Sequence, residues 1–239
     1  MNAQERSRHR VCVVIPAFRE EKRIAAVVHS VRDRGFDVVV IDDGSDDRTG
    51  EEARQAGATV VRHEQNQGKG VALNSGFTYA VEKHYDGAIT MDADGQHDPA
   101  ELPKFVEAYV RTGIPVFIGN RMAKNEEMPL VRRWTNQFMS WMLSRVMGQY
   151  VPDTQCGYRF YRCDVLPFIT AHSERFAAES EILLHVAARG IRIDSVRIST
   201  IYGDEKSKIN PMVDTVRFFS MLWRFRKRVV HQRNAGQGR

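Results

Sequence analysis

Short apolar runs alternate with stretches of helical periodicity through the first half of the chain. The runs predict strands at residues 11–15, 37–42, 59–62, 87–92 and 114–118. Between them, apolar residues recur at helical spacing, and Gly35 and Gly57 supply two of the expected helix ends. Strands that alternate with helices of this length predict an α/β fold, with a mostly parallel, Rossmann-like sheet and helices on both faces. Ligands bind to such sheets at the carboxyl ends of the strands.

Two later segments, residues 129–148 and 211–230, combine apolar and basic positions in a helical pattern. An apolar stripe with basic residues beside or opposite it is typical of a helix that lies at an interface. The sequence therefore predicts two amphipathic interfacial helices. In the first, the residues that carry the pattern include Trp134, Phe138, Trp141, Arg132 and Arg133.

The composition indicates one soluble globular domain. Of the 239 residues, 42% are hydrophobic and 27% are charged, which excludes a disordered, collagen-like or polytopic membrane chain. No apolar run approaches the roughly 18 residues of a spanning helix. Because no repeat or Pro/Gly-rich linker divides the chain, we expect an extension at residues 1–10, one domain at 11–210 and a basic helix and tail at 211–239.

The net charge of +5 is unevenly distributed along the chain. Seven basic residues and no acidic ones follow residue 216, which leaves the preceding residues at −2. A cationic tail of this kind favours an anionic membrane surface, and a nucleic-acid tail is the lesser alternative. The three cysteines are odd in number and have no C-x-x-C spacing, so we expect reduced cytosolic thiols rather than disulfides or a zinc site.

Two carboxylates follow the predicted strand at residues 87–92. Asp92 and Asp94 are two positions apart, so both side chains point the same way from a strand. Such a pair would repel unless a divalent cation lay between them, and hard oxygen ligands suit Mg²⁺ or Mn²⁺ bridging to a substrate phosphate. A lone D-x-D is weak evidence, because a solvated acidic turn that caps the helix near Pro99 has the same pattern.

The other predicted strand ends add nucleotide-binding chemistry. Asp43 could accept hydrogen bonds from a nucleobase edge, with Pro16 and Phe18 as walls for the ring, although a turn or capping role is an equal alternative. Lys69 lies in a glycine-rich loop at the start of a predicted helix. Such a loop favours the binding of an anion, although a simple glycine-rich turn is the alternative. The chain contains no G-x-G-x-x-G and no G-x-x-x-x-G-K-[ST], so dehydrogenases and P-loop NTPases are excluded.

In order, the segments VVIPAFRE, VVVIDDGSDD, NQGKG, MDADGQHDP, GNR and DTQCGYRFY resemble glycosyltransferase family 2, the inverting GT-A nucleotide-sugar transferases. The resemblance covers residues 11–210. Within the family, DADGQH, GNR and the late YGDEKSKIN look like the dolichol-phosphate mannose synthase and polyprenyl-phosphate sugar synthase group. The Q-x-x-R-W pattern of processive polysaccharide synthases is missing, which disfavours a polymerase.

This resemblance implies a GT-A fold and a role for each matched residue. The metal would be held by Asp94 and Gln96, with Asp92 beside them, and Lys208 would close over the donor diphosphate. An arginine that the family carries near Lys208 is absent, which puts the assignments in that loop in doubt. The nucleoside is assigned to Pro16, Phe18, Glu20, Ile41 and Asp43, the ribose and diphosphate to Asp92, Ala93 and Asp94, and the acceptor phosphate to Arg121 with Arg132 or Arg133.

Three functions remain open. The first is a metal-dependent transferase that moves a sugar from a UDP- or GDP-sugar to a polyprenyl phosphate, whose ionised oxygen needs no general base. The second is a soluble transferase with a hydroxyl acceptor, for which Asp153 is the candidate base. The third is a catalytically silent nucleotide- or partner-binding module, against which the complete set of Asp43, Asp92, Asp94 and Gln96 argues.

The first function also predicts where the protein is located. A polyprenyl phosphate lies in a membrane, so we expect a cytoplasmic protein held peripherally on the inner face of the membrane, by lipid contact or by a small membrane-protein partner. Nucleic acid is not an expected partner. The same amphipathic segments would, on the alternative interpretation, simply pack on the sheet or on a second subunit.

Overall fold

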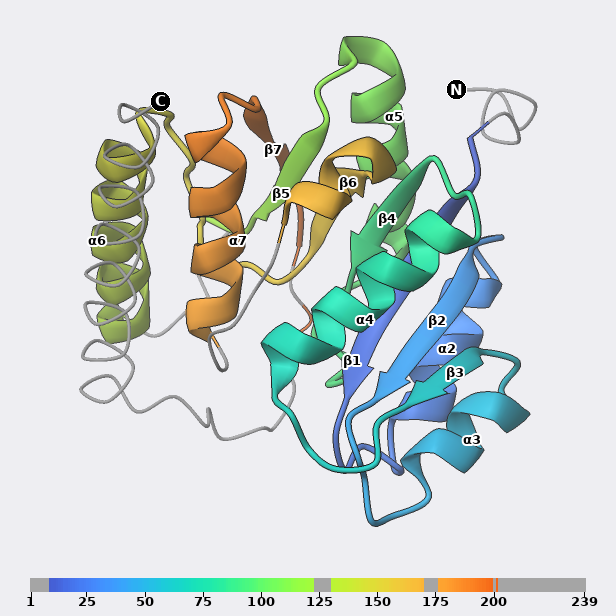
Figure 1. The fold of residues 1–239 in the computed structure, drawn as a ribbon. Helices are drawn as coiled ribbons and strands as arrows, with labels where there is room; N and C mark the ends of the chain where they lie inside the picture. The colour runs from blue at the N-terminus through green and yellow to red at the C-terminus, as the bar shows by residue number, and fades with distance from the viewer. Residues whose placement is uncertain (1–8, 123–129, 170–175, 200, 202–239) are drawn as a thin grey trace, which may run out of the picture.

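One seven-stranded sheet forms the centre of the computed structural model, which describes residues 9–122, 130–169, 176–199 and 201 (Figure 1). Its strand order is β3-β2-β1-β4-β6-β5-β7. Every neighbouring pair is parallel except those of β6, which runs antiparallel to both β4 and β5. The strands are β1 (Val11–Ala17), β2 (Asp37–Asp42), β3 (Thr59–Arg62), β4 (Gly87–Thr90), β5 (Val116–Asn120), β6 (Arg159–Arg162) and β7 (Ile193–Arg197).

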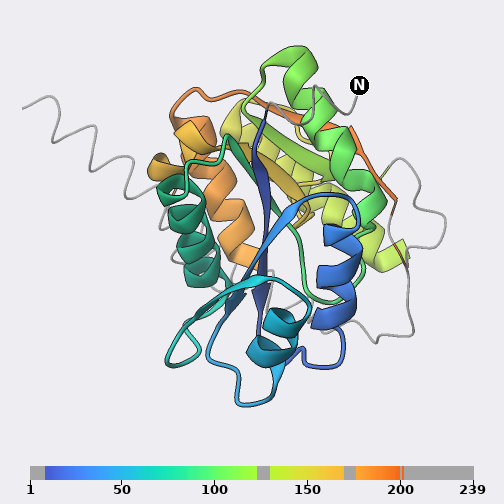
Figure 2. The same ribbon diagram turned by 90° about the vertical axis from the view of Figure 1, so that its right-hand side faces the viewer.

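Helices cover both faces of the sheet. Seen edge-on, α4 and α7 lie on one side and α2 and α5 on the other (Figure 2), and α6 lies beside α7 at the outside of the molecule (Figure 1). The helices are α2 (Ile24–Arg32), α3 (Thr49–Gln55), α4 (Lys69–Glu82), α5 (Leu102–Thr112), α6 (Leu130–Met147) and α7 (Phe176–Ala188), with 3₁₀ turns η1 (Pro99–Glu101) and η2 (Cys163–Phe168).

The central strands are buried along almost their whole length. All four residues of β4 and six of the seven in β1 are buried, as expected for parallel strands covered by helices on both faces. On α2, the apolar residues at 24, 27, 28 and 31 form the predicted stripe and pack into this core. Removing that apolar surface from water is the main force that holds the layers together.

The predicted elements up to residue 118 and the helix at 129–148 are confirmed, with ends shifted by a few residues. The sequence analysis did not predict β6, α7 or β7. The segment of β6 is only four residues long and contains two arginines, so it carries no apolar alternation, yet Arg159 is fully buried. None of the helices that the structure describes is long and apolar enough to cross a membrane. The predicted helix at 211–230 lies outside the described residues.

Candidate functional site

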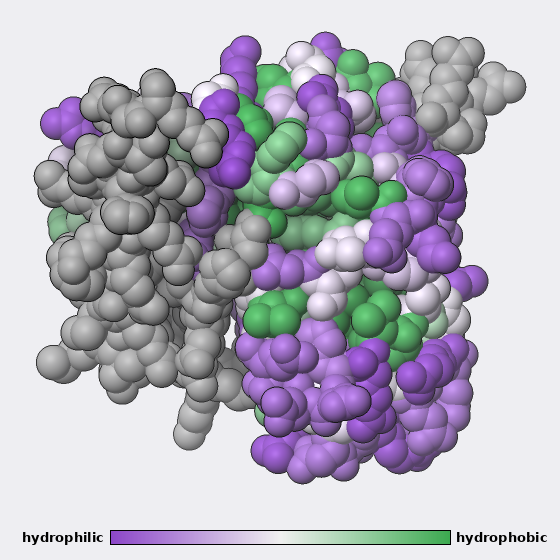
Figure 3. All heavy atoms as spheres, in the orientation of Figure 1, coloured by the Kyte–Doolittle hydropathy of each residue, from purple (hydrophilic) through white to green (hydrophobic). Residues whose placement is uncertain are grey.

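The carboxyl ends of β1, β2 and β4 meet at one edge of the sheet. In the parallel register, Ala17 pairs with Asp42 and Val14 with Thr90, so the loops that follow these strands gather there. On the face shown in Figure 3, hydrophilic residues cover this end of the molecule, around α3 and the loops beside it. The candidate residues from three distant segments are therefore brought to one place.

Asp43 anchors the loop between β3 and α4. Its carboxylate oxygens accept hydrogen bonds from the backbone N–H groups of Gln67 (2.9 Å) and Gly68 (2.8 Å), and Oδ1 lies 2.7 Å from His63 Nδ1. The next residue, Gly44, has φ +71°, and a Cβ there would overlap the backbone of Gln65. Glycine is required at this close approach, and the loop is held tightly against the end of β2.

The other residues assigned to the nucleoside differ in exposure. Phe18 is 38% exposed, with the guanidinium of Arg19 5.0 Å from the centre of its ring, and Pro16 and Glu20 are half-buried. Ile41 is fully buried in the core beneath them. Phe18 and Pro16 thus lie beside the anchored loop as accessible apolar surfaces, whereas the Ile41 side chain supports the site from below.

The loop after β4 is shaped by hydrogen bonds to His97. The backbone N–H of Asp92 donates to His97 Nδ1 at 3.2 Å, and the imidazole stacks on Tyr158 with 4.8 Å between ring centres. Burial lowers the pKa of His97, so the ring is held neutral with Nδ1 as the acceptor. Asp94 Oδ1 accepts from the backbone N–H of Gln96 at 3.0 Å, which turns the loop.

A divalent cation fits the side of this loop that carries Asp94 and Gln96. Both side chains are half-buried and offer hard oxygen ligands, and no described residue donates a hydrogen bond to Asp94 Oδ2. The described residues contain no group of three His, Cys, Asp or Glu side chains that could hold a metal alone. A cation there would complete its coordination with ligand and water oxygens, as Mg²⁺ usually does.

Lys69 is the first residue of α4 and links two carboxylates. Its Nζ lies 2.5 Å from Asp92 Oδ1 and 2.6 Å from Glu179 Oε1 on α7. Burial alone would raise the pKa of Asp92, but the charge of Lys69, together with its hydrogen bond, holds it at about 2. Burial opposes the charge of Lys69, and the two carboxylates outweigh it and raise the pKa of the amine. Lys69 and Asp92 therefore form a charged pair at neutral pH.

Arg121 and Asp153 form a buried, two-pronged ion pair. Arg121 follows β5, and its Nε and Nη2 donate to Asp153 Oδ2 (2.7 Å) and Oδ1 (2.9 Å). The Asp153 side chain is 0% exposed. The loop that carries Asp153 is held in turn by Arg159, whose guanidinium donates to the carbonyls of Thr154, Cys156 and Glu179. Both oxygens of the candidate base are therefore engaged with a guanidinium.

The remaining predicted residues lie on or after α6, or beyond the described chain. Arg133 is half-buried on α6, whereas the side chain of Arg132 and all of Lys208 lie outside the described residues. The last described residue, Ile201, donates its backbone N–H to the carbonyl of Gln96 at 3.0 Å. The chain after β7 therefore returns to the loop that carries Asp94.

The sequence analysis missed three residues of this site: Glu179, His63 and Arg159. A glutamate in the first turn of a mostly apolar helix was the available signal for Glu179. His63 and Arg159 carried no such signal, because their contacts with Asp43 and with the Glu179 carbonyl each join positions 20 residues apart.

Comparison with known proteins identifies the family. The sequence profile described as Glycosyl transferase family 2 matches residues 12–169, which span β1 to β6 and the site residues that these strands and their loops carry, but not Glu179 on α7. The chain belongs to this family. It is a glycosyltransferase, and its sheet and helices form the expected GT-A fold.

Two similar proteins are named as transferases that act on polyprenyl phosphates. The chain is 31% identical to the UDP-N-acetylglucosamine–dolichyl-phosphate N-acetylglucosaminyltransferase of Methanococcus voltae over 215 residues, covering 80% of this chain and 86% of the relative. It is 32% identical to the undecaprenyl-phosphate mannosyltransferase of Micrococcus luteus over 208 residues, covering 80% and 84%. These relatives match almost the whole of the described chain.

A solved structure shows the same fold. Glucosyl-3-phosphoglycerate synthase from Mycobacterium tuberculosis, in complex with Mn²⁺, UDP and phosphoglyceric acid, superposes with a TM-score of 0.71. The match covers 93% of this chain and 80% of the synthase at 19% identity. This likeness supports the GT-A architecture of the glycosyltransferase.

Proposed function

We propose that this glycosyltransferase moves a sugar, with inversion, from a nucleotide-diphosphate sugar to a polyprenyl phosphate. The observation that carries the proposal is the Arg121–Asp153 pair. A hydroxyl acceptor needs a general base within hydrogen-bond reach of its proton. Asp153 is fully buried with both oxygens on one guanidinium, so the candidate base is occupied. A phosphate acceptor is already ionised near neutral pH and needs no base.

The donor is assigned to the edge formed by β1, β2 and β4. Pro16 and Phe18 wall the base, and Asp43, with the loop that it anchors, meets its polar edge. Asp94 and Gln96 would hold Mg²⁺ or Mn²⁺, and the donor would be a UDP- or GDP-sugar. When bound, the cation supplies charge stabilisation to the departing nucleoside diphosphate. Lys208 is assigned to the same diphosphate by family resemblance.

The acceptor phosphate is assigned to Arg121, with Arg132 or Arg133 on α6. Nε and Nη2 of Arg121 both donate to the Asp153 carboxylate. The pairing fixes the guanidinium in one orientation, so that it positions the phosphate for in-line attack on the anomeric carbon. The bond from that carbon to the diphosphate breaks as the new bond to the phosphate oxygen forms.

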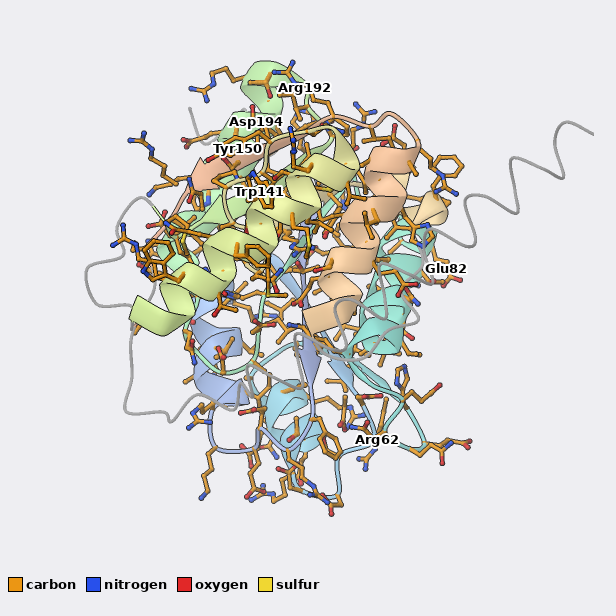
Figure 4. The ribbon with its side chains drawn as sticks, turned by 90° about the vertical axis from the view of Figure 1, so that its left-hand side faces the viewer. Arg62, Glu82, Trp141, Tyr150, Arg192 and Asp194 are labelled. Carbon is orange, nitrogen blue, oxygen red and sulfur yellow. The ribbon has the colours of Figure 1, made fainter. Side chains whose placement is uncertain are left out.

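The membrane contact is assigned to α6 and the basic tail. Trp134, Phe138 and Trp141 are 72%, 53% and 58% exposed and follow one face of α6. Figure 4 shows Trp141 on the outward side of this helix. Aromatic rings at the headgroup level, with basic residues beside them, are typical of peripheral membrane binding. The proposal places the protein on the inner face of the cytoplasmic membrane.

A transfer assay tests the proposal. Purified protein is mixed with each of UDP- and GDP-sugars, Mn²⁺ and vesicles that contain a polyprenyl phosphate, and release of the nucleoside diphosphate is measured. We expect release that requires the lipid phosphate. Equal release with the corresponding polyprenol, or with a soluble sugar hydroxyl, would contradict the phosphate acceptor. No donor hydrolysis and no transfer with any sugar nucleotide would favour a catalytically silent nucleotide- or partner-binding module.

A further inference from the structure

The Lys69 ammonium lies where a cation would bridge Asp92 and Glu179. Nζ is 2.5 Å from Asp92 Oδ1 and 2.6 Å from Glu179 Oε1, so two carboxylates, one from the loop after β4 and one from α7, converge on one positive charge. The Glu179 side chain is 4% exposed, and among the described residues its Oε2 has no hydrogen-bond partner. A buried carboxylate with a spare oxygen is costly unless a cation compensates it.

Backbone packing holds the two carboxylates close together. A Cβ at Gly157 would lie 2.9 Å from Asp92 Oδ2 and 3.1 Å from Glu179 Oε1, so the glycine is needed for both side chains to fit. The Gly157 carbonyl accepts from Thr90 Oγ1 at 2.7 Å, and the Glu179 carbonyl accepts from Arg159 at 2.7 Å. These bonds fix the backbone positions from which the Asp92 and Glu179 side chains approach each other.

We propose that Glu179 is a positioning residue that holds Lys69 on Asp92, and that Lys69 serves as the resident cation of the donor site. The ammonium takes the place that a divalent ion would otherwise occupy between Asp92 and Glu179. The divalent ion that accompanies the nucleotide is then confined to Asp94 and Gln96, where it faces the diphosphate. The inference deepens the proposed function and rests on its donor site.

Metal binding without nucleotide tests this inference directly. Mn²⁺ is titrated into wild-type protein, K69M and the double variant K69M/E179Q, and free Mn²⁺ is measured by electron paramagnetic resonance. Because K69M leaves two carboxylates facing each other, we expect it to bind one Mn²⁺ about 10-fold more tightly than the wild type. The second change should abolish that gain. Equal Mn²⁺ affinity in K69M and the wild type would overturn the proposal.

A second measurement keeps the inference testable if K69M does not fold. E179Q removes one charge but retains the shape of the side chain. We expect the dissociation constant of this variant for nucleotide with Mn²⁺ to rise about 10-fold, because loss of a residue that orients a ligand-binding side chain typically weakens binding by this much. E179D should recover part of the loss. The matched control is E181Q on the same helix, where Glu181 Oε1 lies 4.0 Å from His185 Nε2. Unchanged nucleotide affinity in E179Q would contradict the positioning role.

The two proposals fail in different ways. If the wild type binds no nucleotide, the proposed donor site is wrong, yet the Mn²⁺ titration of K69M still reports on the cation site. If the wild type transfers sugar to the lipid phosphate and K69M gains no Mn²⁺ site, only the role given to Lys69 and Glu179 is wrong.

Discussion

Arg121 holds Asp153 through two nearly parallel hydrogen bonds of 2.7 and 2.9 Å in the interior of the protein. This pair joins the end of β5 to the loop before β6, two segments that lie 32 residues apart in the chain. A buried carboxylate in this state is part of the scaffold of the proposed acceptor site, and its charge keeps the guanidinium in place.

Removing one partner of this pair should destabilise the protein strongly. D153N leaves a buried guanidinium without its counter-charge, so we expect the free energy of unfolding to fall by about 3 kcal/mol. Urea unfolding measures the change. The matched control is D46N, which breaks the fully exposed Arg19–Asp46 pair and should change stability little. A D153N protein as stable as the wild type that had lost only its activity would instead favour Asp153 as a base.

Asp94 should be required for metal-dependent nucleotide binding and not for folding. It is half-buried, and among the described residues its carboxylate accepts a hydrogen bond only from the backbone N–H of Gln96 in the same loop. A ligand at 100 times its dissociation constant stabilises the folded state by about 2.7 kcal/mol, and we expect D94A to lose this gain for nucleotide with Mn²⁺. Thermal unfolding with and without nucleotide measures it. D164N, at an exposed aspartate paired with Arg162, serves as the control and should keep the shift.

The contact between Glu101 and Ser199 should make stability depend on pH. Burial opposes the charge of Glu101, but hydrogen bonds from Lys104 and Ser199 outweigh it and lower the pKa of the carboxyl. A group whose pKa is lower in the folded state adds stability above its unfolded pKa, about 4.3 for glutamate, and loses it as the pH falls. We expect E101Q to cost about 1–2 kcal/mol at pH 7.

The pH course distinguishes this effect from a general loss of packing. The difference in unfolding free energy between wild type and E101Q should shrink as the pH is lowered below 4.3, because the wild-type carboxyl then becomes protonated. Urea unfolding across this range measures the difference. A difference that stays constant down to pH 3 would show that the charge of Glu101 is not the cause.

The exposed face of α6 should determine vesicle binding. Trp134, Phe138 and Trp141 are more than half exposed, so their replacement by serine removes little packing. Each ring that enters the membrane interface contributes roughly 1 kcal/mol or more, and we expect the triple variant to bind anionic vesicles about 100-fold less tightly. Vesicle co-sedimentation measures binding. The control is V110S on α5, at a valine that is 41% exposed. Unchanged binding by the triple variant would assign α6 to a protein partner.

The candidate donor site could be predicted from sequence because its parts follow strands. Asp43, Asp92 and Asp94 come directly after apolar runs, and parallel strands end at one edge of the sheet. The antiparallel β6 could not be predicted in this way. Its pairing with β4 and β5 is set by a chain reversal over tens of residues, and local apolar periodicity carries no record of it.

The sequence by itself determined the alternating α/β order, the family and the residues proposed for the donor site. The tertiary structure decided which charges meet. Lys69 is 110 residues from Glu179, and Arg121 is 32 from Asp153. Ion pairs across such distances depend on how helices and strands pack, because only packing brings the two groups within reach and removes the water between them. The packing of these elements thus made Asp153 a partner of Arg121 and brought a second carboxylate, that of Glu179, to Lys69.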